Sequence, residues 1–120
     1  YMSKGVSFIA INSNDIIRYP EDSPENMINL VQEYNIPFPY LFDESQDIAR
    51  SYHAECTPDF NIFNNEMRCV YRGQIDSSRP GNNKNNDGAD IRKVLDQIIN
   101  QETISSAQTP STGCSIKWKN

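Results

Sequence analysis

The fold is decided by residues 54–63, which read Ala-Glu-Cys-Thr-Pro-Asp-Phe-Asn-Ile-Phe. Proline cannot donate a hydrogen bond to a sheet ladder, so Pro58 belongs at the entrance of the strand formed by the apolar run after it. Asn64 and Asn65 follow, and this residue type tolerates the positive φ values of two-residue hairpin turns. The stretch therefore predicts a strand over residues 59–63, a tight turn, and a second strand over residues 67–72.

The Thr57–Pro58 bond is a candidate cis peptide, because only bonds that precede proline take the cis form cheaply, usually in a specific turn. Cys56 stands two residues before this proline. A thiol beside such a turn is a first indication of redox chemistry. The alternative is that Cys56 is a small buried residue with no reactive role.

Two segments before the hairpin have clear signatures. Residues 6–11 are almost continuously apolar, which is typical of a strand buried on both faces of a parallel sheet. Ser23 and Pro24 have the residue types favoured at a helix N-cap and first turn, and Asn35 is a plausible end. The apolar residues between them recur at helical spacing and are expected to face the core: Met27, Leu30, Val31 and Tyr34.

The remaining elements complete an alternating pattern. Residues 37–42 predict a short strand, and Asp43 with Gln46 has the spacing of a capping box before a helix over residues 46–52. A polar loop over residues 73–87 leads to a last helix, whose expected apolar face comprises Ile91, Val94, Leu95, Ile98 and Ile99. The order of strands and helices predicts an α/β fold in which helices cover both faces of a mixed sheet.

The composition limits the function classes. The 120 residues are one domain or part of one, and the net charge of -5 argues against binding to nucleic acid or to anionic membranes. No apolar run approaches the ~20 residues that a membrane helix needs. Three cysteines without close pairing argue against a disulfide framework and favour a reducing, cytoplasmic compartment. No glycine-rich phosphate loop is present, so no organic cofactor is expected.

The chain resembles the redoxin group of thioredoxin-like proteins, also called the alkyl hydroperoxide reductase/thiol-specific antioxidant (AhpC/TSA) or peroxiredoxin-like group. The motifs that carry the resemblance occur in the family's order: Tyr19 to Glu25, Pro37 to Leu41, Asp43 to Gln46, Cys56 to Phe60, Val70 to Gly73 and Gly113 to Lys119. The resemblance implies a three-layer α/β/α thioredoxin-like fold that is incomplete at the N-terminus. Residues 1–102 would be the C-terminal two-thirds of that domain, and residues 103–120 a tail packing on it.

The resemblance also implies a missing segment. Family members begin with a strand and a helix that carry the reactive cysteine, and no residue of this sequence matches that cysteine. The missing strand would lie between the strand of residues 6–11 and the strand of residues 59–63. We therefore expect no direct hydrogen-bonded ladder between these two strands. Such a ladder within one chain would refute the predicted strand order.

The resemblance implies a site and an activity. Thr57 and Pro58 match the family's substrate-binding cis-proline loop, and Cys56 is a candidate auxiliary thiol. The parent protein would reduce a peroxide or a disulfide, with a thiol electron donor as partner and a homodimer as a possible assembly, whereas the 120 residues alone would be inactive. The alternative is a non-catalytic thioredoxin-like module that uses the cis-proline loop and residues 73–87 to bind an extended partner.

Other candidate residues are expected to have structural roles. Cys69 lies in a predicted strand and is expected to pack in the core. Cys114 lies in the polar tail, where a structural thiol is favoured over a reactive one. His53 and Cys56 have a spacing that can begin a metal site, but zinc needs four ligands, so no metal is expected. For Arg72 and Arg79, ion pairs within the loop are favoured over binding of an acidic substrate.

Overall fold

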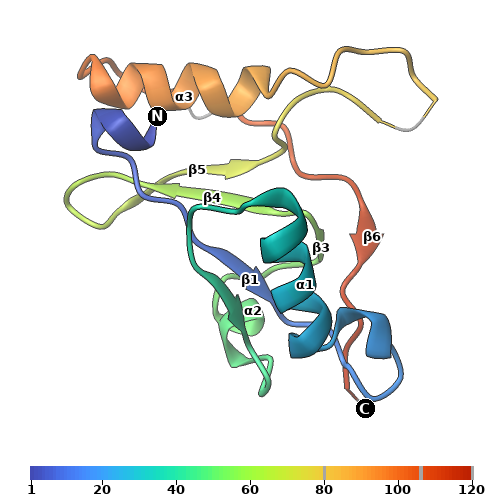
Figure 1. The fold of residues 1–120 in the computed structure, drawn as a ribbon. Coiled ribbons are helices and arrows are strands. Elements are labelled where there is room, and N and C mark those ends of the chain that lie inside the picture. Colours follow the sequence, from blue (N-terminus) through green and yellow to red (C-terminus); the bar gives the residue numbers. More distant parts are fainter. Residues whose placement is uncertain (80, 106, 120) are drawn as a thin grey trace. The chain divides into compact units, whose positions relative to one another are not determined.

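The computed structural model describes residues 1–79, 81–105 and 107–119 (Figure 1). It is a mixed α/β structure with few helices and three small, two-stranded sheets. The chain divides into two compact units, which are described separately below. The first contains Tyr1 and the described part of Cys56–Cys114, and the second contains Met2–Glu55 and the described residues from Ser115 onward.

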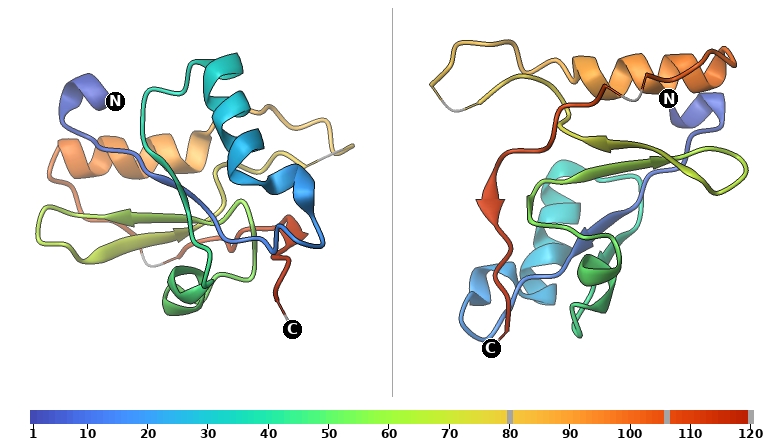
Figure 2. Two further views of the ribbon diagram at one scale, coloured as in Figure 1. Left: turned by 60° about the horizontal axis from the view of Figure 1, so that its bottom comes forward. Right: turned by 180° about the vertical axis from the view of Figure 1, so that it is seen from behind.

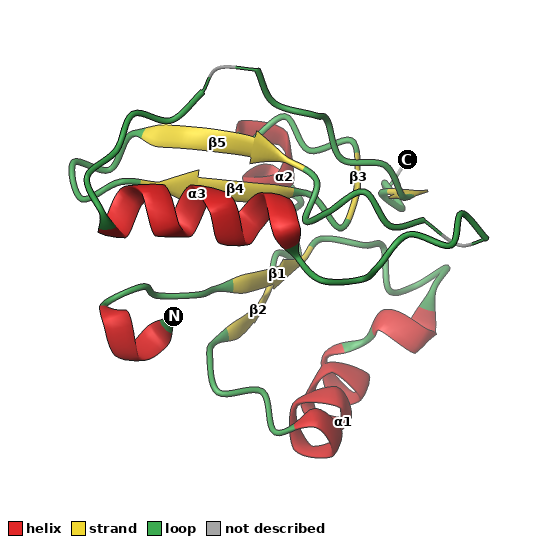
Figure 3. Ribbon diagram, turned by 90° about the horizontal axis from the view of Figure 1, so that it is seen from above, coloured by secondary structure: helices red, strands yellow, loops and turns green. Residues whose placement is uncertain are grey.

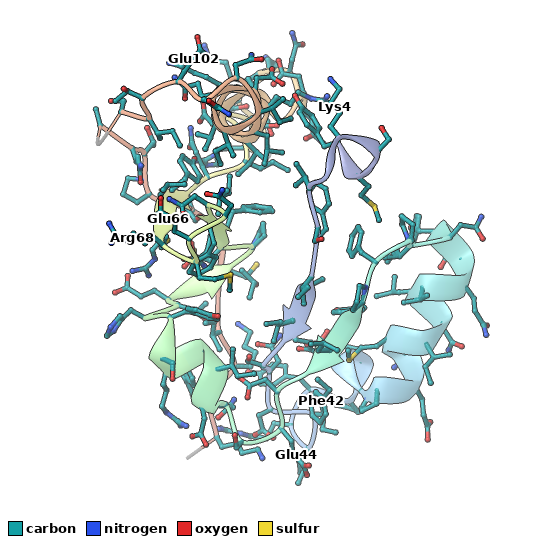
Figure 4. All side chains as sticks on the ribbon, turned by 90° about the vertical axis from the view of Figure 1, so that its left-hand side faces the viewer. Lys4, Phe42, Glu44, Glu66, Arg68 and Glu102 are labelled. Atoms are coloured by element: carbon teal, nitrogen blue, oxygen red, sulfur yellow. The ribbon has the colours of Figure 1, made fainter. Side chains whose placement is uncertain are left out.

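The first unit is built on the predicted antiparallel hairpin of β4 (Phe60–Phe63) and β5 (Cys69–Gly73). Phe60 lies opposite Gly73 and Ile62 opposite Tyr71, with a register shift between Ile62 and Phe63. Both strands begin one to two residues later than predicted. Glu66 and Arg68 lie at the tip of the hairpin (Figure 4).

The predicted two-residue turn at Asn64 and Asn65 is wrong, because the connection between the strands is longer. The Asn64 N–H donates to the Arg68 carbonyl at 2.9 Å, and the Asn64 side-chain oxygen accepts from the N–H groups of Glu66 and Arg68 at 2.9 and 3.0 Å. The positive φ of the turn falls on Met67, at 60°. Asn64 therefore organises the turn through its side chain, and not through a left-handed backbone.

Helix α3 (Ala89–Ile99) lies along the hairpin, as two views show (Figures 1 and 3). It begins after Gly88, whose φ of 67° is readily accessible to a residue without a Cβ. The predicted apolar face is confirmed at its centre, where Val94 and Leu95 are buried together with Tyr71 of β5. Ile99, at the end of the helix, is partly exposed. The core of this unit is therefore narrow and depends on few side chains.

The outer edge of β5 is covered by a later part of the same unit. The Gln108 amide accepts from the Arg72 N–H at 3.1 Å and donates to the Val70 carbonyl at 2.8 Å. Just beyond the strand, the Gln74 N–H donates to the Thr109 carbonyl at 3.0 Å. Gly73 permits this close approach, since a Cβ there would lie 2.3 Å from the Thr109 carbonyl oxygen.

In the second unit, β1 (Ala10–Asn12) and β2 (Tyr40–Phe42) pair in parallel, with Ile11 opposite Leu41. The strand predicted over residues 6–11 is therefore shorter and begins later than expected. The unit also contains two 3₁₀ helices, η1 (Met2–Lys4) and η2 (Pro20–Asp22), and the α-helices α1 (Pro24–Tyr34) and α2 (Asp47–Ser51).

Helix α1 has the boundaries that the sequence predicts. The Ser23 hydroxyl accepts from the Asn26 N–H, and Pro24 occupies the first turn. Asn35 ends the helix in the left-handed conformation, with φ at 49°. Met27 is the buried residue of this helix, and its sulfur accepts a hydrogen bond from the Asn12 side chain of β1.

The capping box predicted from Asp43 and Gln46 is not observed. Gln46 precedes α2 with a φ of 66°, and the Asp43 carboxylate instead accepts from the N–H groups of Ile48 and Ala49, further along the helix. Burial raises the pKa of Asp43, but a hydrogen bond from the Ser13 hydroxyl and those from the helix outweigh this effect, so the net shift is downward.

Gln46 joins the last residues of the chain to this unit. Its side chain is fully buried, its amide nitrogen donates to the carbonyls of Ser13 and Lys117 at 2.7 and 3.0 Å, and its oxygen accepts from the Lys119 N–H at 2.9 Å. The Lys117 carbonyl also accepts from the Asp15 N–H at 2.7 Å. Every hydrogen-bonding group of the Gln46 side chain is thus engaged.

The third sheet pairs β3 (Cys56–Thr57) with β6 (Cys114–Ser115), the red arrow in Figure 2. Among the described residues, β1 pairs with β2 within the second unit and β4 pairs with β5 within the first. No helix in the described part of the chain combines the length and apolar character required to span a bilayer.

Candidate functional site

The candidate site is the thiol loop, which we define as residues 56–59. It leads from β3 into the hairpin, and the Thr57–Pro58 peptide is cis, as predicted. Cys56 is half-buried, and its thiol lies 4.0 Å from the Pro58 carbonyl, a weak donor contact within the loop. Thr57 and Pro58 are exposed. The structure therefore brings all three predicted site residues together at one accessible turn.

Gly113, which precedes β6, packs against the backbone of the thiol loop. A Cβ added to it would lie only 2.2 Å from the Thr57 carbonyl oxygen, far inside van der Waals contact. The Thr57 hydroxyl donates in turn to the Cys114 carbonyl at 3.5 Å. Gly113 and Cys114 therefore both contact Thr57.

The other end of the loop is held by Asp59, whose carboxylate is largely buried. The Ser111 hydroxyl lies 3.0 Å from one carboxylate oxygen and also within reach of the Gly73 carbonyl, so it donates to one of them at a time. Arg72 forms an ion pair with the other oxygen at 3.4 Å. These contacts come from the hairpin and from Ser111, and they hold Asp59 at the end of the thiol loop.

Replacing Gly113 by alanine is expected to disturb the thiol loop directly. Because the new methyl group would overlap the Thr57 carbonyl, backbone must shift, at a cost of about 1–3 kcal/mol in the free energy of unfolding. The reaction rate of the Cys56 thiol with a maleimide should change as well, which is measured by mass spectrometry in a background where Cys69 and Cys114 are serine.

The matched control is Gly88→Ala in the same unit, where a φ of 67° strains an alanine without any overlap with Thr57. We expect it to destabilise the chain by a comparable amount and to leave the labelling rate of Cys56 unchanged. An unchanged Cys56 rate in the Gly113→Ala variant would show that this contact does not position the loop.

A second polar cluster orders the long loop after the hairpin, and it centres on Asp76, which is 1% exposed. Its carboxylate accepts from the N–H groups of Ser78 and Gly88 at 2.9 and 2.8 Å and from the Ser78 hydroxyl. Arg79 donates to the main-chain carbonyls of Asp76 and Ser78 and to the side-chain oxygen of Gln74. Pro80, also in this loop, lies outside the described residues.

Ion pairs were predicted for both Arg72 and Arg79, and the outcome differs between the two residues. Arg72 pairs with Asp59, whereas the guanidinium of Arg79 bonds to carbonyl oxygens and makes no ion pair with the Asp76 carboxylate among the described contacts. The contacts of Asp76 and Arg79 hold the described part of this loop next to Gln74 and Gly88.

Asp76 is expected to make the free energy of unfolding of the chain depend on pH in the acidic range. The Ser78 hydroxyl and the Gly88 N–H hold the pKa of Asp76 below its ordinary value of 3.8, since both bond to the ionised form. The stabilisation is therefore complete above this value and is lost as the pH falls through the lower pKa of the folded state. We expect the difference in unfolding free energy between the native chain and Asp76→Asn to be constant from pH 7 to 5 and to shrink below about pH 4.

Urea unfolding at a series of pH values measures this difference. Glu102→Gln, which removes an exposed carboxyl group of the same unit, controls for the loss of one negative charge. A difference that stays constant down to pH 2.5 would contradict the role assigned to the Asp76 carboxylate.

Of the other two cysteines, Cys114 contacts the site through its main chain, whereas Cys69 lies in the hairpin. The prediction that Cys69 packs in the core is wrong, because it lies exposed at the start of β5. Cys114 is exposed in β6, and none of the three cysteines forms a disulfide. Within the described ranges, no three side chains of His, Cys, Asp or Glu gather to form a metal site.

Sequence reasoning missed the contributions of Asp59, Ser111 and Gly113. Asp59 is adjacent to Pro58, and an acidic residue beside a candidate site is a signal that can be read. Gly113 and Ser111 lie more than 50 residues later in a polar tail, where the sequence alone carries no sign that they contact Thr57 and Asp59.

Comparisons with known proteins give neighbours without an assigned role. No family model and no curated protein matches the chain. A solved structure described as an uncharacterized conserved protein from Geobacillus kaustophilus matches with 56% identity and a TM-score of 0.97, over 99% of this chain and 63% of that chain. A hypothetical protein from Sinorhizobium meliloti 1021 matches with 44% identity and a TM-score of 0.96, over 99% of this chain and 65% of that chain. The chain spans less than two thirds of the length of each neighbour.

Proposed function

We propose that the chain is part of a thioredoxin-like thiol oxidoreductase of the redoxin, or AhpC/TSA, group, with a three-layer α/β/α fold. The observation that carries the proposal is the accessible turn in which Cys56, Thr57 and Pro58 lead into β4, β5 and α3. The same order of proline turn, hairpin and helix is what the sequence resemblance implies. We propose further that the whole protein is cytoplasmic and assembles as a homodimer.

The roles of the loop residues follow from their positions. Thr57 and Pro58 are exposed and would bind the substrate, with the backbone at Thr57 available to an extended chain. Cys56 is a candidate auxiliary thiol. The nucleophilic thiol belongs to a segment outside these 120 residues, because no cysteine here has the position that the resemblance requires.

The reaction of the whole protein would use two thiols. A thiolate attacks one oxygen of a peroxide, the O–O bond breaks, and the alkoxide leaves with a proton as water or an alcohol, which makes the sulfur a sulfenic acid. A second thiol then attacks that sulfur and releases water, which forms a disulfide. A dithiol electron donor reduces this disulfide by exchange and is itself oxidised. With a disulfide as substrate, the first step is a thiol–disulfide exchange.

The test compares two proteins: the 120-residue chain and the protein in the length that its gene encodes. Consumption of hydrogen peroxide and of cumene hydroperoxide is measured with dithiothreitol as donor, and reduction of insulin disulfides is measured separately. We expect turnover by the longer protein, none by the 120-residue chain above the rate of free thiols, and loss of turnover when the cysteine outside these residues is replaced.

Replacing Cys56 by serine in the longer protein separates its role from that of the nucleophile. An auxiliary thiol should slow turnover and not abolish it, while Cys69→Ser, an exposed cysteine outside the loop, should have no effect. Turnover by the 120-residue chain alone would overturn the proposal. A longer protein with no additional cysteine and no turnover would instead support a non-catalytic binding module.

A further inference from the structure

The loop after the hairpin ends in the dipeptide Asp87–Gly88, directly before α3. In such a dipeptide, the main-chain nitrogen of the second residue can attack the side-chain carboxyl carbon of the aspartate and close a five-membered ring. Glycine leaves this nitrogen the least hindered, because it has no Cβ. Asp87 is exposed, so water reaches its carboxyl group. The sequence thus places a chemically labile bond at the start of the helix.

Three hydrogen bonds fix the groups that would react. The Gly88 N–H donates to the Asp76 carboxylate at 2.8 Å, and the carbonyl of the same peptide group, from Asp87, accepts from the Arg92 Nε at 2.8 Å. The Asp87 side chain is fixed as well, because its Oδ1 accepts from the Ala89 N–H at 3.0 Å. Ring closure requires this peptide group to rotate relative to the Asp87 side chain, so all three bonds oppose it.

The bond to Asp76 also opposes a second step, the loss of the proton from the Gly88 nitrogen. Asp76 is almost completely buried, and the Ser78 hydroxyl and the Gly88 N–H lower its pKa, so it is ionised at neutral pH. A buried negative charge beside the nitrogen disfavours the negative charge that proton loss would create there. Arg92 has the opposite electrostatic effect, but its side chain is exposed, where water screens its charge.

We propose that Asp87–Gly88 is a site of spontaneous isoaspartate formation, and that the Asp76 carboxylate suppresses this reaction in the folded chain. The Gly88 nitrogen gives its proton to water and attacks Cγ of the protonated Asp87 carboxyl group. A C–N bond forms, the C–OH bond breaks, and the hydroxide leaves with that proton as water. Water then opens the resulting succinimide. Opening at the main-chain carbonyl gives isoaspartate with no net change of atoms, and opening at the other carbonyl restores aspartate.

Isoaspartate at this position would loosen the start of α3. It routes the main chain through the aspartate Cβ and so adds one atom between the loop and the helix. The Ile75 carbonyl ties this end of the helix to the loop, since it accepts from the N–H groups of Asp90 and Ile91 at 3.1 and 3.2 Å. With an additional atom in the main chain, these bonds and the one from Gly88 to Asp76 cannot all keep their present lengths. The proposal does not depend on thiol chemistry.

Peptide mapping by chromatography and mass spectrometry tests the proposal after incubation of the 120-residue chain at pH 6 and 37 °C. A synthetic peptide of residues 84–91 gives the rate without protection. We expect the native chain to form isoaspartate roughly tenfold or more slowly than the peptide, because a hydrogen bond to a charged group must break first. Asp76→Ala should approach the rate of the peptide. Asp76→Asn, whose side-chain oxygen can still accept from the Gly88 N–H, should lie between the native chain and Asp76→Ala.

Leu95→Ala is the matched control, since it destabilises the same unit and leaves the bond between Asp76 and Gly88 in place. The two variants are compared at urea concentrations that make their unfolded fractions equal. Leu95→Ala should then form isoaspartate roughly fivefold or more slowly than Asp76→Ala, because local opening at Gly88 is still opposed. If Asp76→Ala does not fold, Asp76→Asn takes its place and should also exceed Leu95→Ala.

Equal rates in the control and the Asp76 variant would mean that unfolding alone controls the reaction, and would overturn the proposal. A native chain as fast as the peptide would overturn it too, as would a peptide that forms no isoaspartate. An Asp76→Ala chain slower than the native chain would show that the carboxylate acts as a base and not as a protecting group.

Hydrogen exchange on the isolated isoaspartyl chain gives a second readout. The amides of Asp90 and Ile91 should lose protection by roughly tenfold or more, because their bonds to the Ile75 carbonyl are strained or broken. The Asn64 amide, which bonds to the Arg68 carbonyl in the hairpin of the same unit, should keep its protection. Unchanged exchange at Asp90 and Ile91 would contradict the loosening of α3.

Discussion

Replacing Gln46 by leucine is expected to lower the free energy of unfolding by about 3–5 kcal/mol. The side chain is fully buried, and leucine would fill similar space without hydrogen bonds. The Ser13 carbonyl and the Lys119 N–H would lose their bonds to Gln46, and the Lys117 carbonyl would keep only its bond from the Asp15 N–H. Each buried group left unsatisfied costs about 1–3 kcal/mol, and some of them will recover water.

Urea unfolding followed by circular dichroism measures this loss. Gln32→Leu makes the same change at an exposed position of α1 in the same unit and should alter stability by no more than about 0.5 kcal/mol. In addition, the Gln46→Leu variant should lose hydrogen-exchange protection at the Lys119 amide. If Gln46→Leu were as stable as Gln32→Leu, the network around Gln46 would contribute nothing to stability.

Replacing Leu95 by alanine is expected to cost about 2–5 kcal/mol, because it removes a large side chain from the small core between α3 and β5. Leu95 is 4% exposed, and its buried companions in this unit are Val94 of the helix and Tyr71 of the strand. A cavity that the surrounding side chains do not fill would place the loss in the upper part of this range.

Ile99→Ala is the matched control, since it removes an aliphatic side chain from the same helix at a position that is 37% exposed. We expect a loss of less than half that of Leu95→Ala, with equal urea m-values for both variants. Equal losses at the two positions would mean that the packing of α3 differs from that described.

The elements that the sequence predicts well are those whose signals are local. Ser23, Pro24 and Asn35 set the ends of α1 because capping depends on residues within one helical turn. The alternating apolar runs on either side of Asn64 likewise predict the hairpin, and helical spacing predicts the buried centre of α3. The proline turn of the candidate site could also be predicted from the sequence, because Cys56, Thr57 and Pro58 are consecutive.

The errors have a common physical origin in contacts between distant residues. Gln46 was assigned a capping role from its spacing to Asp43, but its side chain bonds to residues more than 70 positions later. The burial predicted for Cys69 was wrong because the alternation of side chains along a strand shows that the strand has two faces but does not show which face is covered. Gly113 could not be identified because its importance rests on one close approach to Thr57.

The amide of Gln108 has a consequence for the behaviour of this protein at high concentration. Strand edges with free N–H and C=O groups recruit strands of other molecules and so begin edge-to-edge aggregation. Gln108 and Thr109 bond the outward backbone groups of Val70, Arg72 and Gln74, which removes two attachment points from β5 and a third just beyond its end. The segment that holds these two residues therefore protects the edge of β5, and its detachment would expose that edge to pairing with strands of other molecules.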